Sequence, residues 1–331
     1  MGALVEKRRG VTMPPWSDRG AGRMAKERRA FDGKTAQSVC AKGVPISVQA
    51  QFHEPPARFE GCFTSFYHMS LDIPDGGQVV DYLQPEWANI RFFGGSCPKA
   101  EIGTSVVSGA AITATGPSTL PCRFELGSSQ VWGIGFLPAG WARFVGGNAF
   151  EMANAVFDGA AHPVFSKFAG LSQTLCDSDA SVEEQLDAIC DMMDRLAKPH
   201  RDEAKIRRVH CELVDGDHAS VCDLADACAM SIRTLERVCR RHFGFTPKLL
   251  MRRQRFMRTL TTFVLHKGSR WTEAMDDAYH DQAQFTREFC EFMTMTPSEY
   301  AAREHPILDS FIAARARIRG SAAQALDAPE G

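Results

Sequence analysis

The chain lacks the patterns that mark several common classes of protein. No apolar run approaches 18 residues, so we expect no transmembrane helix. The first residues carry no hydrophobic segment of the kind found in a signal peptide. A Gly-x-Ser-x-Gly elbow, a phosphate-binding loop and a dinucleotide fingerprint are also missing. These absences favour a soluble cytoplasmic protein, and 331 residues are enough for two domains with separate cores.

Clustered metal ligands are missing as well. The eleven cysteines are scattered singly, without a Cys-x-x-Cys, which is typical of reduced thiols buried as small apolar side chains. His53 and His68 are isolated, and no His-x-His sequence occurs. We therefore expect no metal site, no cofactor and no catalytic residue.

The N-terminal segment, residues 1–38, has little apolar periodicity. It holds nine basic residues and four acidic ones, a composition typical of disordered chain. This arm either adds nonspecific attraction to DNA or precedes the true start of the protein at Met24, and the composition fits both interpretations.

Residues 39–146 carry short runs of β-branched and aromatic residues, separated by Gly, Pro and Ser. Eight runs at this spacing predict a β-barrel or β-sandwich: residues 45–49, 62–67, 79–83, 88–93, 105–107, 111–115, 122–126 and 131–136. A barrel without catalytic motifs indicates a binding cup for a small-molecule effector, lined by aromatic side chains and a polar anchor. The candidate effector-binding residues are Trp87, Arg91, Phe92, Trp132 and Phe136.

Residues 147–200 have a helical pattern that is clearest from Ser181 to Lys198. Ser181 and Glu184 have the spacing of a capping box. Apolar residues then recur in steps of four and three, as in coiled coils: Val182, Leu186, Ile189, Met193 and Leu196. This stripe packs either on the barrel of its own chain or on the same helix of a second subunit. The segment is therefore interpreted as a linker that also forms a homodimer.

The most informative stretch runs from Ser231 to Arg270. It holds eleven basic residues and one acidic residue, whereas the whole chain has a net charge of −2. Such a block at helical spacing indicates a polyanionic partner. Leu235, Val238 and Phe243 form an apolar face opposite the arginines, as a helix in a DNA major groove requires.

Two helix-turn-helix units follow from the flanking residues. A short capped helix from Ser220 runs through a tight turn into the helix that begins at Ser231. The pattern recurs about 49 residues later, with a short helix at 271–279 and a second helix at 281–292. Each unit ends in a Thr-Pro pair that starts another helix, and residues 247–265 form a linker helix between the units.

This region, residues 205–304, resembles the DNA-binding domain of the AraC family of bacterial transcription regulators. The matching residues are Leu224-Ala225 and Ser231-x-Arg233-x-Leu235-x-Arg237 in the first unit, and Tyr279-x-Asp281-Gln282-Ala283-x-Phe285-x-Arg287-x-Phe289 and Thr296-Pro297-Ser298-Glu299-Tyr300 in the second. The β-rich part is similar to the cupin-like sensor half of these regulators in the order and the composition of its segments. The resemblance implies an α+β chain: a β-rich cupin-like N-terminal barrel followed by an all-α double helix-turn-helix domain at 201–305. The Ala-rich end of the chain predicts a flexible tail at 306–331.

Three glycines usual in that family are replaced here. Ala229 and Ala278 stand in the turns before the two recognition helices, and Thr294 precedes the closing Thr-Pro. A residue with a Cβ atom loses about 1 kcal/mol when it is forced to a positive φ. Either these turns relax to another conformation or the domain is less stable than its relatives.

The candidate DNA-binding residues follow from charge and from helix position. The N-terminal end of a recognition helix meets base edges, which places Arg233 and Thr234 against the bases. The resemblance implies that Arg237 faces the groove or the DNA backbone. Arg240 and Arg241 are expected to meet phosphates, together with Arg252 and Arg253 of the linker helix.

Residues 271–305 hold two basic and eight acidic residues, so the second unit is expected to touch DNA weakly, through Gln282, Gln284 and Arg287. Its acidic surface either contacts another protein, such as RNA polymerase, or only keeps the domain soluble.

The hypothesis is a transcription regulator, in particular an activator, that binds double-stranded DNA and responds to a small-molecule effector. Two alternatives remain at this point. One is an enzyme with a cupin-like catalytic barrel, and the other is a scaffold protein whose helix-turn-helix units have lost DNA contact.

Overall fold

The computed structural model describes residues 36–39, 45–177, 179–265, 271, 279, 281–319 and 323–329. Most of the predicted N-terminal arm lies outside the described residues. Its last three residues belong to strand β1 (Ala36–Val39), which pairs with the next strand, so the prediction of disorder is wrong there. In the described part of the chain, no helix has the length and apolar character needed to cross a membrane.

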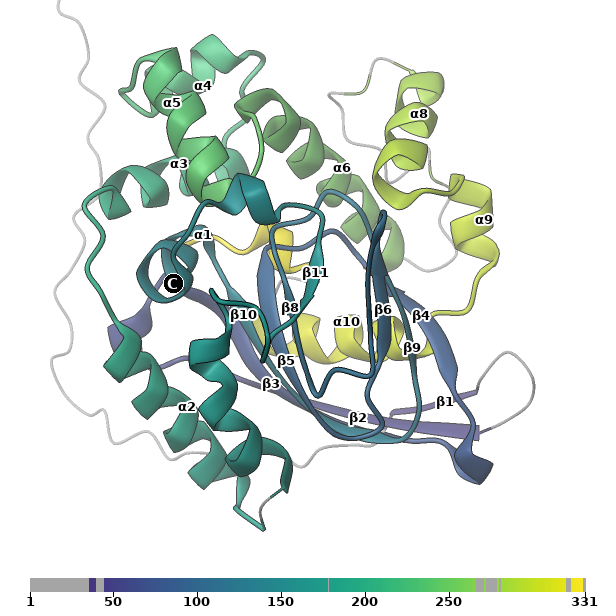
Figure 1. Ribbon diagram of the computed structural model, residues 1–331. Helices are drawn as coiled ribbons and strands as arrows, with labels where there is room; N and C mark the ends of the chain where they lie inside the picture. The colour runs from purple at the N-terminus through teal and green to yellow at the C-terminus, as the bar shows by residue number, and fades with distance from the viewer. Residues whose placement is uncertain are drawn as a thin grey trace, which may run out of the picture. The chain divides into compact units, whose positions relative to one another are not determined.

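Two antiparallel sheets form the β-rich half (Figure 1). The larger sheet has the order β1, β2 (Pro45–His53), β3 (Phe63–Asp72), β10 (Ser129–Phe136), β5 (Ala88–Gly95), β8 (Ile112–Thr115) and β11 (Val156–Asp158). The smaller sheet has the order β4 (Val79–Leu83), β9 (Cys122–Leu126), β6 (Lys99–Ile102) and β7 (Ser105–Ser108). The α+β class predicted from the sequence is confirmed.

All eight strands expected from the sequence are present, and β1, β6 and β11 are additional. Strand β11 pairs with β8 through only three residues, so its own sequence carries little signal. It lies in the stretch 147–200 that was expected to be helical, which extends the β-rich half beyond residue 146. The rest of that stretch contains short 3₁₀ and π turns at Ala149–Met152 (η4), Ser166–Leu171 (η5) and Gln173–Asp177 (η6).

Helix α2 (Val182–Leu196) begins at the predicted capping box. The Ser181 backbone N–H donates to the Glu184 carboxylate at 2.8 Å, and the Glu184 N–H donates back to the Ser181 hydroxyl. Its apolar stripe packs into the chain's own core, where Ile189 and Met193 are fully buried and Val182, Leu186 and Leu196 are partly buried. The sequence left two packing partners open for this apolar stripe, the barrel of its own chain or the same helix of a second subunit. The structure supports packing on the barrel of the same chain.

The C-terminal half is helical. The first unit consists of α4 (Val221–Ala227) and α5 (Ile232–Val238), with α5 extended by a π turn, η7 (Cys239–Phe243). Helix α3 (Glu203–Asp215) precedes this unit, and the linker helix α6 (Pro247–Leu265) separates it from α8 (Gln282–Met293) and α9 (Pro297–Ala302) (Figure 1). The short helix expected at 271–279 lies outside the described residues except for Trp271 and Tyr279.

The tail expected to be flexible is instead a helix over most of its described length. Helix α10 (Pro306–Arg319) contacts β2 and β4 (Figure 1), and Ile307, Leu308 and Ile312 are buried there. The prediction of a flexible tail is therefore wrong for residues 306–319, because the apolar face of α10 closes one opening of the β-rich half. Residues 323–329 continue with a short 3₁₀ turn at Gln324–Leu326 (η8) that contacts α6.

The two halves share one apolar core, in addition to the core that lies within the β-rich half. One apolar cluster joins Trp87, Leu137 and Ala139 of the β-rich half to side chains of α3, α4, α5 and α6. Helix α1 (Pro138–Gly140) follows β10 directly and contacts α3. The first helix-turn-helix unit is therefore packed against the β-rich half by shared apolar side chains.

Candidate DNA-binding surface and effector cavity

Helix α5 presents the predicted base-contacting residues. The Ser231 hydroxyl accepts a hydrogen bond from the Thr234 N–H at 3.3 Å and so fixes the helix start. Leu235 and Val238 are fully buried, which turns the opposite face outward. Arg233 lies exposed on that face, and Thr234 is half-buried beside it.

The arginines that follow are exposed, but two of them have partners. Arg237 lies 3.5 Å from the Asp202 carboxylate, and the Arg240 guanidinium lies 5.1 Å from the centre of the Phe150 ring. Arg241 is exposed in η7. All four arginines of this surface, Arg233, Arg237, Arg240 and Arg241, can therefore reach solvent, as a phosphate-binding surface requires.

Arg253 was expected to bind phosphate, but it is fully buried. Its guanidinium lies over the Trp87 ring at 4.1 Å, and its three nitrogens have no hydrogen-bond partner among the described residues. Burial lowers the pKa of Arg253 to about 9. This position of α6 faces the β-rich half, so the prediction of a DNA contact is corrected.

The neighbouring arginines of α6 pair with the second unit. Arg252 donates to Glu288 at 2.8 Å and also to Glu291, while Arg255 donates to Glu288 at 2.7 Å. The Tyr279 hydroxyl donates to the same Glu288 carboxylate at 3.0 Å. These contacts hold α8 against α6, so the charge of Arg252 is already balanced by carboxylates.

In the second unit, α8 starts at Asp281, whose carboxylate accepts from the Gln284 N–H. Gln282 and Arg287 are exposed and Gln284 is half-buried. Phe285, Phe289 and Phe292 are buried, as the sequence pattern predicted. Of the three candidate DNA-contacting residues of this unit, Arg287 is therefore the exposed cation.

The replaced glycines keep the left-handed backbone. Ala229 has a φ of 52° and Thr294 has a φ of 57°. The turns have not relaxed to another conformation, so both residues hold a strained geometry. Ala278 lies outside the described residues.

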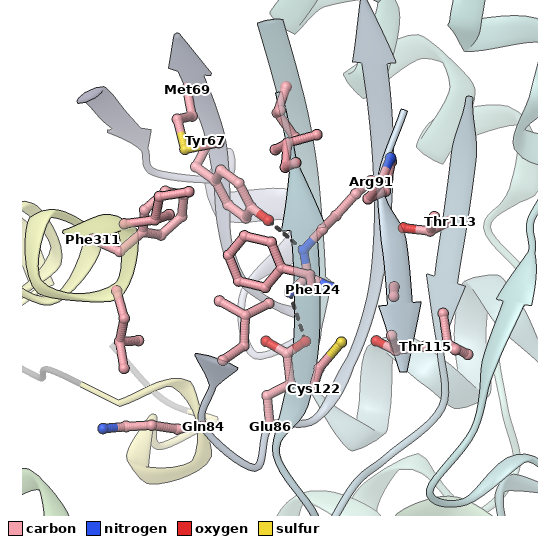
Figure 2. A pocket seen from close by; sticks show the side chains of 18 of the residues that line it. Tyr67, Met69, Gln84, Glu86, Arg91, Thr113, Thr115, Cys122, Phe124 and Phe311 are labelled. Atoms are coloured by element: carbon pink, nitrogen blue, oxygen red, sulfur yellow. Dashed lines mark hydrogen bonds and ion pairs between the residues drawn. The ribbon is translucent and has the colours of Figure 1, made fainter. Parts of the chain in front are cut away.

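A cavity of about 100 Å³ lies between the two sheets, with α10 along one side (Figure 2). Most of its lining is apolar, including Met69, Phe93 and Phe124 from the strands and Phe311 from α10. Apolar lining with a few fixed polar groups is typical of small-molecule sites.

A buried ion pair forms part of the polar lining of this cavity. Arg91 donates to the Glu86 carboxylate at 2.6 Å and to the Tyr67 hydroxyl at 2.7 Å (Figure 2). Glu86 also accepts from the Asn89 side chain at 3.0 Å. Thr115 adds a buried hydroxyl without a hydrogen-bond partner among the described residues. A ligand could therefore bind through a charged or a hydrogen-bonding group.

Of the five candidate effector-binding residues, only Arg91 lines this cavity. Phe92, Trp132 and Phe136 belong to the core on the other face of the larger sheet, with α2. Successive residues of a strand point to opposite faces, so Phe93 and Val131 face the cavity and their neighbours do not. Trp87 lies in the core shared with the first helix-turn-helix unit. The prediction is corrected for these four residues.

Helix α10 is anchored to the smaller sheet by one carboxylate. Asp81 of β4 is fully buried and accepts hydrogen bonds from the Ile307 and Leu308 N–H groups, each at 2.9 Å. It also lies 3.0 Å from His305 Nδ1. The N–H groups at a helix start need acceptors, and Asp81 supplies one from the β-rich half. Asp81, His305 and the start of α10 are called the α10 anchor below.

Four of the described cysteines, including Cys122 and Cys228, are buried as the sequence predicted, whereas Cys222 and Cys290 are exposed. Burial raises the pKa of Cys122 to about 12 and the pKa of Cys228 to about 11, so both stay protonated at neutral pH. His53 and His68 stack on Trp132, with ring centres 5.7 and 5.1 Å away. Both rings therefore pack against an aromatic side chain of the β-rich half.

Comparison with known proteins supports the assignment of the helical half. Residues 224–303 match a family model described as a helix-turn-helix domain. A search of curated proteins found no match. The C-terminal part of the chain is therefore a helix-turn-helix domain, and its predicted resemblance to AraC-type regulators is confirmed.

Solved structures give weaker likenesses. ToxT from Vibrio cholerae has a TM-score of 0.39 at 11% identity, over 68% of this chain and 97% of that chain. ToxT from Vibrio cholerae bound to an unsaturated fatty acid has a TM-score of 0.36 at 12% identity, over 68% and 94%. The AraC-like transcriptional activator CuxR has a TM-score of 0.30 at 15% identity, over 67% and 85%.

Proposed function

We propose that this protein is a sequence-specific DNA-binding transcription regulator whose first helix-turn-helix unit provides most of the affinity. The observation that carries the proposal is the α5 surface, where a capped helix within a helix-turn-helix domain exposes Arg233 at its start and Arg237, Arg240 and Arg241 beyond it. Arg233 reads a base edge, and the later arginines neutralise phosphates. The second unit supports this binding through Gln282, Gln284 and Arg287.

The effector in this proposal is a small, mainly apolar molecule with one polar group that meets Arg91 or Glu86. The cavity of about 100 Å³ is smaller than the roughly 300–1,000 Å³ of most ligand sites, so a larger effector enters only as α10 shifts. Helix α10 follows α9 of the second unit after a few residues. Effector binding would thereby change how the helix-turn-helix domain is held and shift the population of the DNA-binding form.

The remaining expectations belong to this proposal. They are a cytoplasmic location, an activating output and a contact between the acidic second unit and RNA polymerase. A homodimer also stays a prediction, but it needs a surface other than the α2 stripe, whose central residues are buried in the same chain. Sedimentation of the purified protein measures the oligomeric state directly.

Selection of bound sequences from random DNA duplexes tests the DNA-binding function. The purified protein should enrich a defined sequence, and affinity for it should fall steeply as salt rises. Recovery of random sequences only, or binding that does not respond to salt, would support the scaffold alternative instead.

The role of the α10 anchor can be tested without knowing the effector. Asp81→Asn keeps the side-chain volume and weakens the hydrogen bonds to α10, so it should change the affinity for the selected DNA. Asp72→Asn, an exposed carboxylate of the same half, is the matched control and should leave that affinity unchanged. Equal affinities for the two variants would show that α10 does not control DNA binding.

A further inference from the structure

Three possible metal ligands meet where the linker joins the first helix-turn-helix unit. His200 and Asp202 lie between α2 and α3, and His242 lies in η7, just after the recognition helix. One ligand atom from each residue lies within 4.8 Å of the other two. Forty residues separate Asp202 from His242, so the sequence offered no spacing motif that would have joined them.

His242 is the unusual member of this group. Its side chain is buried, with 2% of the residue exposed, yet neither ring nitrogen has a hydrogen-bond partner among the described residues. Buried imidazole nitrogens are normally satisfied. Burial also lowers the pKa of His242 to about 4, so the ring is neutral at physiological pH, which is the form that binds metals.

The other two residues are arranged to offer ligand atoms. His200 Nδ1 accepts the Asp202 N–H at 3.2 Å, which leaves Nε2 for another partner. Asp202 precedes α3 and is 4% exposed, but its carboxylate makes none of the capping hydrogen bonds usual at that position. The two imidazole rings lie 4.9 Å apart, centre to centre.

We propose that His200, Asp202 and His242 bind one divalent transition-metal ion of the Zn²⁺ class. Two imidazoles and a carboxylate suit this ion, with a water molecule in the fourth position. Ligand atoms of a tetrahedral zinc site lie about 3.3 Å apart, so ligand atoms that now lie up to 4.8 Å apart must approach by up to about 1.5 Å. Rotation of the half-exposed His200 ring provides most of that movement.

The neighbouring cations set the conditions for binding. Lys205 lies 3.1 Å and Arg237 lies 3.5 Å from the Asp202 carboxylate, and Arg201 lies 3.9 Å from it. These charges compete with the metal and lower its affinity. When the metal binds the Asp202 carboxylate, Arg237 on the α5 surface loses its ion-pair partner. The ion would therefore both tie the linker to the first helix-turn-helix unit and free one of its arginines.

Cobalt and zinc titrations of the full chain test this site in the absence of DNA. After treatment with a chelator, the protein should bind one Co²⁺ with a visible absorption band, and Zn²⁺ should displace it and raise the melting temperature. His200→Ala and Asp202→Asn should each weaken binding by at least tenfold. His218→Ala is the matched control, because His218 is a histidine outside this three-residue group that pairs with Glu212, and it should bind as the parent does.

Other results would overturn the proposal. The absence of a one-to-one Co²⁺ complex, or equal affinity in His200→Ala and the parent, would show that these residues bind no metal. An intense near-ultraviolet thiolate band would place the ion on the cysteines instead. Far-ultraviolet circular dichroism confirms that each variant is folded, and His200→Ala is the safest variant because its ring is only half-buried. None of these measurements depends on DNA binding.

Discussion

At the scale of single residues, neighbouring arginines of α6 have unrelated roles. Residues one apart on a helix point about 100° apart, so Arg252 meets the carboxylates of α8 while Arg253 lies on Trp87. The sequence predicted a basic linker helix, but charge alone does not show which side of the helix is covered. That requires knowing where the β-rich half packs.

Arg253→Met tests the corrected role of Arg253. A buried guanidinium without hydrogen-bond partners is unfavourable, so an apolar side chain of similar length should raise the free energy of unfolding by about 1–3 kcal/mol. The salt dependence of DNA binding should not change. Arg241→Ala is the comparison, since losing an exposed phosphate contact should reduce that slope by about 0.9. A reduced slope for Arg253→Met, measured by salt titration, would restore Arg253 to the DNA surface.

His210 gives stability a pH dependence. It is fully buried beside Trp87, and burial lowers its pKa to about 3. Between that value and the ordinary histidine pKa near 6.5, the unfolded chain binds a proton that the native protein does not. The free energy of unfolding therefore has its full value above about pH 6.5. It falls by up to about 1.4 kcal/mol per pH unit as the pH is lowered.

Urea unfolding at pH 7 and pH 5 measures this effect. His210→Phe keeps an aromatic ring but cannot take up a proton, so it should lose less stability between the two values than the parent. An equal loss in both proteins would mean that His210 is not held neutral by its surroundings.

At the scale of elements, local pattern predicted most of the fold. The eight strands, the Ser181 capping box and the Ser231 start of α5 follow from neighbouring residues and are all present. Helix α10 was missed because its stability comes from covering the β-rich half and from Asp81, more than 220 residues earlier. The effector residues were chosen for aromatic character, and strand alternation placed three of them on the wrong face.

The strained turns give a prediction at this scale. Ala229→Gly and Thr294→Gly should each raise the free energy of unfolding by about 1 kcal/mol, because glycine adopts a positive φ without steric conflict. Thermal melting of the two variants and their combination measures the gain, which should be nearly additive for turns in separate units. Ala219→Gly, an exchange at a position without a positive φ, should not stabilise the protein. A lower melting temperature for Ala229→Gly would contradict the assignment of strain.

At the scale of the whole molecule, the shared core is the main departure from the sequence-based picture. The sequence predicted two domains with separate cores, whereas Trp87 and Leu137 pack with α3 to α6 and α10 closes the β-rich half. Contacts between segments that are far apart in the sequence leave no pattern in the local sequence. Neither the shared core nor the packing of α10 could therefore be predicted from the spacing of residues. Helix α10 both lines the cavity and packs with side chains of α6, α8 and α9, so it connects the cavity to the helix-turn-helix domain.

The most direct test of the account compares one arginine from each helix-turn-helix unit. Affinities for the selected DNA sequence, and for versions with single base changes, should be measured at fixed salt for Arg233→Ala and Arg287→Ala. Arg233→Ala should cost about 1–3 kcal/mol and relax the preference at one base pair, with a smaller loss for Arg287→Ala. A larger loss for Arg287→Ala would contradict the claim that the first unit dominates DNA binding.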